Sequence, residues 1–173
     1  MTSEVMAARA ALHFWEEPCI SGTEGSGAVF FSGCSLGCVF CQNDPISHGG
    51  LGETVAPRRL AEIFRELTEA GAHNINLVNP TPHVPAIIRA LELYKPPVPI
   101  IYNTGGYDRV ETLRALEGAV DVYLPDLKYM HGDIARRFSG AADYFENASA
   151  AILEMARQTG PMELDDEGLA RRG

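Results

Sequence analysis

Short apolar stretches alternate along this chain with segments in which apolar and polar residues recur at helical spacing. The apolar run at 28–31 is expected to form a buried strand, and further strands are expected at 74–78, 98–102 and 120–124. Between the strands, apolar residues recur three and four positions apart, as in a helix that buries one face. Strands that alternate with helices of about 10–15 residues indicate βαβ units and a parallel sheet.

The expected helices have recognisable ends. The first begins near Pro57, a residue favoured in the first turn of a helix, and ends at Gly71. Asp108 is expected to cap a later helix that ends at Gly118, because a carboxylate accepts the unpaired N–H groups of a first turn. The remaining helices are expected at 84–91, 132–138 and 141–158.

The chain is expected to fold as one domain with a real core. Residues 1–27 are an N-terminal approach with a short helical stretch at 5–12, and residues 28–160 are the βα core. Residues 161–173 are expected to form a short tail or a hairpin around an acidic turn. The expected fold class is α/β with about four parallel strands. Four strands are too few to close a (β/α) barrel.

Composition and charge narrow the possible partners. The 173 residues are 46% hydrophobic and 21% charged, with a formal net charge of -9, which argues against a nucleic-acid backbone as the main partner. No apolar run approaches the roughly 20 residues that cross a membrane, and the N-terminus lacks the regions of a signal peptide. A cytoplasmic, reducing location is therefore expected, where cysteines serve more often as metal ligands or catalysts than in disulfides.

Three cysteines, Cys34, Cys38 and Cys41, follow the first expected strand with the spacing C-x3-C-x2-C. Three thiolates on one short loop can hold three corners of an iron–sulfur cube and leave the fourth iron open to a small molecule. A zinc site is the alternative, with a fourth ligand from Cys19, His13 or His48. Zinc sites favour paired C-x2-C units, however, and this chain has one x3 gap and one x2 gap. Inert thiols remain the third interpretation.

Polar residues follow each of the other expected strands. Because the carboxyl ends of parallel strands meet at one edge of a sheet, these residues are expected to line one mouth with the cysteines. They are Asn79 and Thr81, Asn103 and Thr104, and Asp126 and Lys128. There are alternative explanations for these residues. Asp126 and Lys128 could form a plain surface ion pair. The asparagines and threonines could hydrogen-bond the backbone of turns and helix ends.

The cysteine loop, with aromatic Phe40 just before its last cysteine, resembles the radical S-adenosylmethionine (SAM) superfamily. The stretches 15–22, 38–43, 74–82 and 123–129 are similar to radical SAM proteins related to pyruvate formate-lyase activating enzyme. The resemblance covers nearly all of the chain. It implies a partial (β/α)6 TIM-like barrel, and because family members usually run on to six strands, the C-terminal strands are expected to be missing here.

The resemblance also implies cofactors and partners. Cys34, Cys38 and Cys41 would be the catalytic metal ligands of a [4Fe–4S] cluster whose fourth iron is chelated by SAM. Reductive cleavage of SAM would give methionine and a 5′-deoxyadenosyl radical that abstracts a hydrogen atom, an oxidoreductase reaction. In activating enzymes that hydrogen comes from a glycine of a glycyl-radical enzyme. That enzyme, and an electron donor such as flavodoxin or ferredoxin, are thus the expected partners.

Individual residues carry over from the family pattern. Asp126 and Lys128 resemble the D-x-K of activating enzymes, in which Lys128 would neutralise the SAM carboxylate. Asn103 and Thr104 would make further SAM contacts, and Phe40 would pack near the adenine.

The chain departs from the wider superfamily after the second strand. Many members have Gly-Gly-Glu there to receive the SAM amino group, whereas this chain has Asn79, Pro80 and Thr81. That contact is expected from Thr81 or a backbone carbonyl. Two other functions stay open: a cluster-binding or SAM-binding remnant without turnover, and a zinc-stabilised interaction module.

Overall fold

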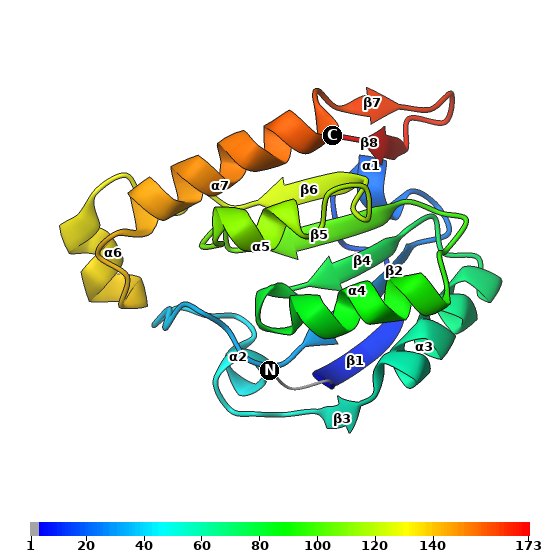
Figure 1. Cartoon of the computed structure of the whole chain (residues 1–173), viewed down its shortest axis with the longest axis horizontal. Coiled ribbons are helices and arrows are strands. Elements are labelled where there is room, and N and C mark those ends of the chain that lie inside the picture. Colours follow the sequence, from blue (N-terminus) through cyan, green and yellow to red (C-terminus); the bar gives the residue numbers. More distant parts are fainter. Residues whose placement is uncertain (1–3) are drawn as a thin grey trace.

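The structure is a computed structural model that describes residues 4–173; residues 1–3, the start of the expected N-terminal approach, lie outside the described residues. A six-stranded sheet with the order β3-β1-β2-β4-β5-β6 forms its centre (Figure 1). Four neighbouring strands run parallel: β2 (Ser26–Phe31), β4 (Ile75–Val78), β5 (Ile100–Thr104) and β6 (Val122–Pro125). The α/β fold class with about four parallel strands is therefore confirmed.

Two antiparallel strands extend the sheet beyond β2, namely β1 (Val5–His13) and β3 (Glu53–Val55). The helix expected at 5–12 is therefore wrong. This segment is rich in alanine and has high helix propensity, but it lies along the open edge of β2 and pairs with it from Ala7 to His13. Pairing with a distant strand outweighs an intrinsic preference of about 0.7 kcal/mol or less per residue.

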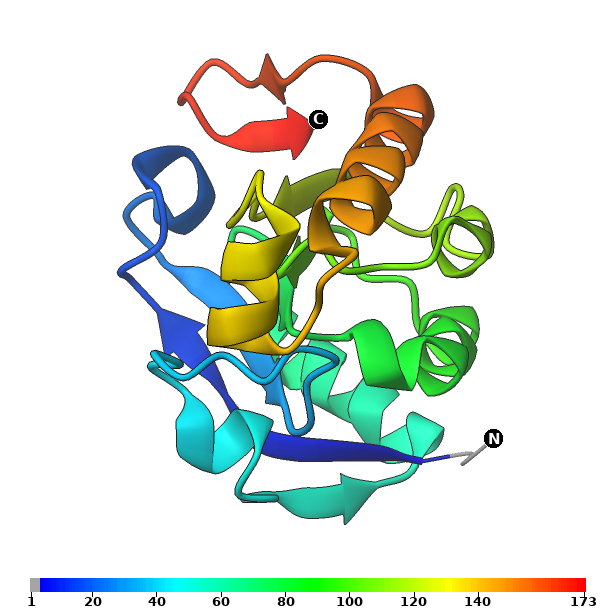
Figure 2. The same cartoon turned by 90° about the vertical axis from the view of Figure 1, so that its left-hand side faces the viewer.

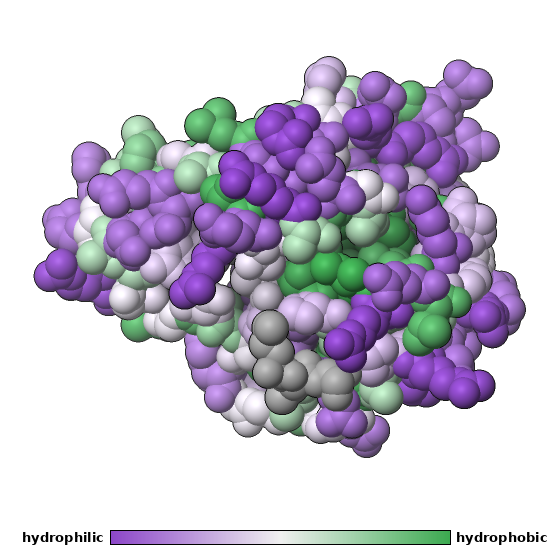
Figure 3. Space-filling model, in the orientation of Figure 1, coloured by the Kyte–Doolittle hydropathy of each residue, from purple (hydrophilic) through white to green (hydrophobic). Residues whose placement is uncertain are grey.

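Four helices pack against one face of the sheet and bury the main core: α3 (Pro57–Glu69), α4 (Val84–Leu93), α5 (Val110–Arg114) and α7 (Tyr144–Thr159). Alternate strand residues point toward these helices, among them the fully buried Val29, Leu77 and Tyr102. In Figure 3, hydrophilic residues frame apolar residues that gather near the middle of the view. Within residues 4–173, no helix is long and apolar enough to cross a membrane.

The opposite face of the sheet carries a smaller apolar cluster. Ile101 and Val122, on β5 and β6, pack there against Ile20 and Ala170. Ile20 belongs to the short helix α1 (Pro18–Ser21), which follows β1. Residues of the predicted N-terminal approach thus form part of the same folded unit as the core.

The C-terminal tail forms a hairpin of β7 (Glu163–Leu164) and β8 (Ala170–Arg172). Gly173 then lies beside β6. Its N–H donates to the carbonyl oxygen of Asp121 at 3.1 Å, and its own carbonyl accepts the N–H of Tyr123 at 2.8 Å. This alternation is the pattern of parallel pairing, so the edge of β6 is covered at that point.

The parallel strands all end at the same side of the sheet, on the left in Figure 1. Three short elements gather there: α2 (Asp44–Ser47), the 3₁₀ helix η1 (Thr81–His83) and α6 (Gly132–Ser139). Figure 2 looks onto this side and shows α6, in yellow, beside the loop that follows β2. The positions of α6 and α7 confirm the helices expected at 132–138 and 141–158.

Asp108 does not cap the helix that follows it, so this prediction is wrong. The N-cap position of α5 is held by Arg109, with no side-chain capping bond. Asp108 is instead 3% exposed, and its carboxylate accepts hydrogen bonds from three hydroxyls: Tyr102 at 2.9 Å, Thr81 at 2.7 Å and Thr104 at 2.6 Å. Three buried donors outweigh one exposed helix end, because a buried carboxylate needs every lone pair satisfied.

Candidate functional site

The three cysteines lie on the loop between β2 and α2, at the carboxyl end of the first parallel strand. The loop leaves the strand through Gly33, whose φ of 91° is a left-handed conformation that favours glycine. Asn79, at the end of β4, donates a side-chain hydrogen bond to the carbonyl of Gly33. The neighbouring strand therefore fixes the start of the cysteine loop.

Two histidines near the loop bind backbone carbonyls. Nε2 of His83 lies 2.7 Å from the carbonyl oxygen of Ser32, and Nε2 of His48 lies 2.8 Å from that of Leu36. The contact with Leu36, together with Asp44, raises the pKa of His48. Both imidazoles thus support the shape of the cysteine loop, a structural role.

The far end of α6 holds the middle of the cysteine loop. Gly37 N–H donates to the carbonyl of Ser139 at 3.0 Å, and Val39 N–H donates to that of Phe138 at 2.9 Å. Leu36 is 3% exposed and belongs to a small core shared with α6 and α7, which contains Ala135, Ala141, Tyr144 and Ala148. Two helices from late in the chain therefore define the position of a loop from early in it.

Each of the three half-buried thiols has a hydrogen-bond partner. Leu36 N–H donates to Cys34 Sγ at 3.4 Å, Ser139 Oγ lies 2.9 Å from Cys38 Sγ, and Ser47 Oγ lies 3.5 Å from Cys41 Sγ. Burial raises the pKa of the Cys34 thiol, an effect that the Leu36 N–H opposes. Over residues 4–173, no group of three or more Cys, His, Asp or Glu side chains is gathered around a point where one metal ion would sit.

A cavity of about 440 Å³ opens beside the loop and collects nine of the ten predicted site residues. Its walls come from the cysteine loop and from the ends of β4, β5 and β6. The nine residues are Cys34, Cys38, Phe40, Cys41, Asn79, Asn103, Thr104, Asp126 and Lys128. The convergence expected from a parallel sheet is thus present in the fold, and the cavity presents thiols, amides, a carboxyl and an amine to one space.

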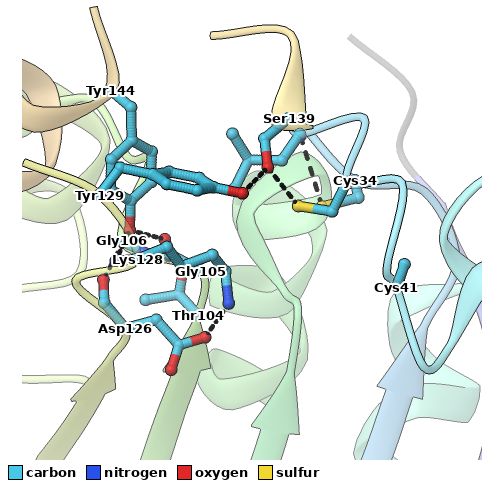
Figure 4. Close-up of polar contacts among 12 residues, drawn as sticks. Cys34, Cys41, Thr104, Gly105, Gly106, Asp126, Lys128, Tyr129, Ser139 and Tyr144 are labelled. Atoms are coloured by element: carbon cyan, nitrogen blue, oxygen red, sulfur yellow. Dashed lines mark hydrogen bonds and ion pairs between the residues drawn. The ribbon is translucent and has the colours of Figure 1, made fainter. Parts of the chain in front are cut away.

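Lys128 supplies positive charge to this cavity. Its side chain is 25% exposed and forms an ion pair with Asp126, whose side chain is 60% exposed (Figure 4). Burial acts to lower the pKa of Lys128, but the hydrogen bond and the charge of Asp126 outweigh it, so the pKa lies above its usual value. Lys128 is therefore a cation at the cavity wall, paired with a carboxylate that solvent partly screens.

Gly105 and Gly106 shape the turn after β5. Gly106 has a φ of 78°, and a Cβ added there would clash with the carbonyl oxygen of Asp126. Glycine is thus required because two protein backbones approach each other. Thr104, at the end of β5, is 4% exposed, and its hydroxyl donates to the buried Asp108.

Thr81 is the predicted site residue that does not line this cavity. Its hydroxyl donates to Asp108, and it faces a neighbouring polar cavity of about 450 Å³. That second cavity is also lined by Tyr107, Arg109 and Asp143. A direct contact of Thr81 with a ligand in the cysteine cavity stays a prediction, and the structure gives its hydroxyl a buried partner.

A buried tyrosine and a buried serine that support the site were not predicted from the sequence. Tyr144 is fully buried, and its hydroxyl joins the turn after β5 to the turn after β6. Ser139 contacts Cys38. Tyr129 contacts Ser139 at 2.7 Å, as Figure 4 shows. These residues follow no motif, and they lie about 100 residues from the cysteines they support.

Comparison with known proteins adds evidence of descent. Residues 28–161 match the family model of the radical SAM superfamily. A curated relative, an uncharacterized protein of Methanocaldococcus jannaschii, is 34% identical over 130 residues. The alignment covers 70% of this chain and 38% of the relative, so the chain spans well under half the length of that protein. The matched region contains the cysteine loop and the polar residues after each parallel strand.

Proposed function

The chain belongs to the radical SAM superfamily, and from that premise we propose that it is an oxidoreductase that holds a [4Fe–4S] cluster and binds SAM in the cysteine cavity. The observation that carries the proposal is the lining of this one cavity. Three thiols of one loop share it with the polar ends of the three other parallel strands. Cys34, Cys38 and Cys41 would hold three irons of the cluster, since thiolates are the usual ligands of such clusters.

The donor set of the cavity fits both groups. The thiols have hydrogen-bond partners that can support negatively charged sulfur. The methionine part of SAM carries a carboxylate and an ammonium, and the cavity offers the Lys128 cation and the Asp126 carboxylate as counterparts. Asn79 and Asn103 add amide groups to the same wall.

Phe40 would orient the adenine of SAM. It is 55% exposed at the cavity wall and lies edge-on to Tyr129, with ring centroids 6.5 Å apart. A planar base can pack against its free face and exclude water from it.

When bound, the cluster and SAM supply a 5′-deoxyadenosyl radical that removes a hydrogen atom from a substrate. The protein's own part is to fix positions. Lys128 and Asp126 would orient the methionine end of SAM, Phe40 would orient its adenine, and Cys34, Cys38 and Cys41 would hold the cluster. The proposed substrate is a glycine of a partner glycyl-radical enzyme, with flavodoxin or ferredoxin as electron donor in the cytoplasm. That finer assignment is supported by the resemblance of 15–22 and 123–129 to activating enzymes.

The test is anaerobic reconstitution with iron and sulfide, followed by SAM and dithionite. About four irons and four sulfides per chain, together with 5′-deoxyadenosine as product, are expected. Cys38→Ala should lose the cluster. Cys19→Ala is the matched control, because Cys19 packs in the apolar cluster around Ile101 and outside the cavity.

The two competing functions give different results in the same experiment. A cluster that binds SAM without forming 5′-deoxyadenosine would identify a binding protein without turnover. One zinc per chain and no sulfide would identify a zinc-stabilised module and contradict the proposal.

A further inference from the structure

Ser139 is a buried hydroxyl placed directly on a cavity cysteine. It ends α6, is 2% exposed, and its Oγ lies 2.9 Å from Cys38 Sγ. This is the shortest of the three contacts to cysteine sulfur described above, the others being 3.4 Å at Cys34 and 3.5 Å at Cys41. The residue pair spans 101 positions of the sequence.

The backbone of α6 sets this geometry independently of the hydroxyl. The carbonyls of Phe138 and Ser139 accept the N–H groups of Val39 and Gly37, on either side of Cys38. Those two N–H groups are therefore already paired with backbone carbonyls. The Ser139 hydroxyl is the group that the fold brings to that sulfur.

The hydroxyl of Tyr129 contacts the hydroxyl of Ser139. Tyr129 Oη lies 2.7 Å from Ser139 Oγ, and either oxygen alone could be the donor. A thiolate that binds iron has no proton, so Ser139 must donate its single proton to Cys38. Ser139 oxygen then accepts from Tyr129, which makes a chain of two hydrogen bonds that ends on an anionic sulfur. Such a chain strengthens each bond by polarisation.

We propose that Ser139, supported by Tyr129, is a positioning residue that raises the reduction potential of the cluster; the inference rests on the proposed function. Hydrogen bonds to cluster sulfurs are among the factors that set these potentials. The reduced cluster carries one more negative charge than the oxidised one, so a donor at Cys38 stabilises it more. Reduction takes one electron from an external reductant and neither forms nor breaks a covalent bond.

The test compares midpoint potentials of reconstituted variants in a mediator-buffered titration followed by electron paramagnetic resonance. Ser139→Ala keeps both backbone bonds to the loop but removes the donor. At the midpoint potential of the wild type, it should lower the ratio of reduced to oxidised cluster about tenfold. For a one-electron couple this equals a fall of about 59 mV in the midpoint potential. Tyr129→Phe should shift the potential less and in the same direction, while Ser139→Thr, which keeps a hydroxyl, should restore it.

Two further variants sharpen the result. Ser47→Ala is the matched control, since it removes a hydroxyl at 3.5 Å from a different cysteine and should shift the potential less than Ser139→Ala. The double variant Tyr129→Phe with Ser139→Ala should match Ser139→Ala alone, because Tyr129 acts through Ser139. A double variant that shifts by the sum of both would overturn the relay.

Iron and sulfide content separates the possible failures. A wild-type chain that takes up no cluster overturns the proposed function and this inference with it. Full iron and sulfide in Ser139→Ala with an unchanged potential overturns the inference alone. Should Ser139→Ala lose the cluster, Tyr129→Phe decides, since it leaves Ser139 in place; an unshifted potential there overturns the inference.

Discussion

The hydroxyl of Tyr144 accepts the backbone N–H of Lys128 at 2.9 Å and so fixes the main chain that carries the cavity's lysine. The same oxygen lies 2.8 Å from the carbonyl of Gly105 and 2.9 Å from that of Asp126. Tyr144 is fully buried, and its ring lies edge-on to Tyr129, 5.3 Å between centroids (Figure 4). One phenol on α7 thus holds together the turns after β5 and β6.

Tyr144→Phe is expected to weaken SAM binding while leaving the iron content unchanged. The change leaves the partly buried N–H of Lys128 without its partner, at a cost of up to about 1–3 kcal/mol, and frees Lys128 to move. Calorimetric titration of the reconstituted protein with SAM measures the loss. Tyr107→Phe is the control, because the hydroxyl of Tyr107 donates to the exposed Asp143. Equal SAM affinity in Tyr144→Phe and the wild type would contradict this role.

Lys128→Met is expected to weaken SAM binding roughly tenfold to hundredfold, the value of a hydrogen bond to a charged group. Lys95→Met, at the chain's other lysine, lies beyond α4 and outside the cavity and should change nothing. Because the pKa of Lys128 lies above its usual value, the amine stays positively charged at every pH below that value. Affinity should therefore stay level between about pH 6 and 9 in this respect. A Lys128→Met variant with wild-type affinity would remove Lys128 from the site.

Gly106→Ala should destabilise the fold more than Gly118→Ala. Both glycines have a positive φ, 78° and 80°, so both substitutions carry a backbone cost of roughly 1–2 kcal/mol. A Cβ at Gly118 meets open space, whereas one at Gly106 meets the carbonyl oxygen of Asp126. Urea unfolding gives the free energy of unfolding of each variant, and the difference between the two losses is the cost of the steric clash at Gly106. Equal losses of stability would show that the turn yields without cost.

Acid should weaken the contact between α7 and α5 in which Glu154 of α7 pairs with Arg114 of α5 at 3.8 Å. Its side chain is 6% exposed, and hydrogen bonds from Arg157 and then Gln158 lower its pKa to about 2. A carboxyl with a lowered pKa stabilises the fold above its unfolded pKa, near 4.5, and loses this contribution as the pH falls toward 2. Glu154→Gln should therefore be less stable at pH 7 and should lose less stability between pH 4.5 and 2. Thermal unfolding across that range measures both, and parallel curves for the two proteins would contradict it.

The sequence allowed the prediction of the parallel part of the fold and of where its ligands gather. The apolar run at 28–31 predicts a buried strand, and the segment 74–78 predicts another because Ile75, Leu77 and Val78 have strand-forming apolar side chains. The polar residues after them come together because parallel strands share one carboxyl edge. Topology alone places Asn103 and Lys128 in one cavity with the cysteines.

The features that were not predictable depend on contacts between distant segments. β1 looks helical by composition and becomes a strand only because β2 offers it an open edge. Asp108 sits where a cap is expected and turns inward to three hydroxyls. Ser139 and Tyr144 lie in helices whose pattern of apolar residues is explained by packing alone. The neighbouring sequence therefore does not indicate which distant atoms their hydroxyls contact.

The bonds from Gly37 and Val39 to the end of α6 have a consequence for the order of events during synthesis. The thiols at 34–41 leave the ribosome about 100 residues before the helix end that fixes their loop. At roughly 5–20 residues per second, that interval lasts about 5–20 s. For this time the three cysteines are present on a loop that lacks its two backbone bonds to α6. The proposed cofactor centre would thus be completed late in translation, and correct loading would depend on a segment that does not yet exist when the cysteines first appear.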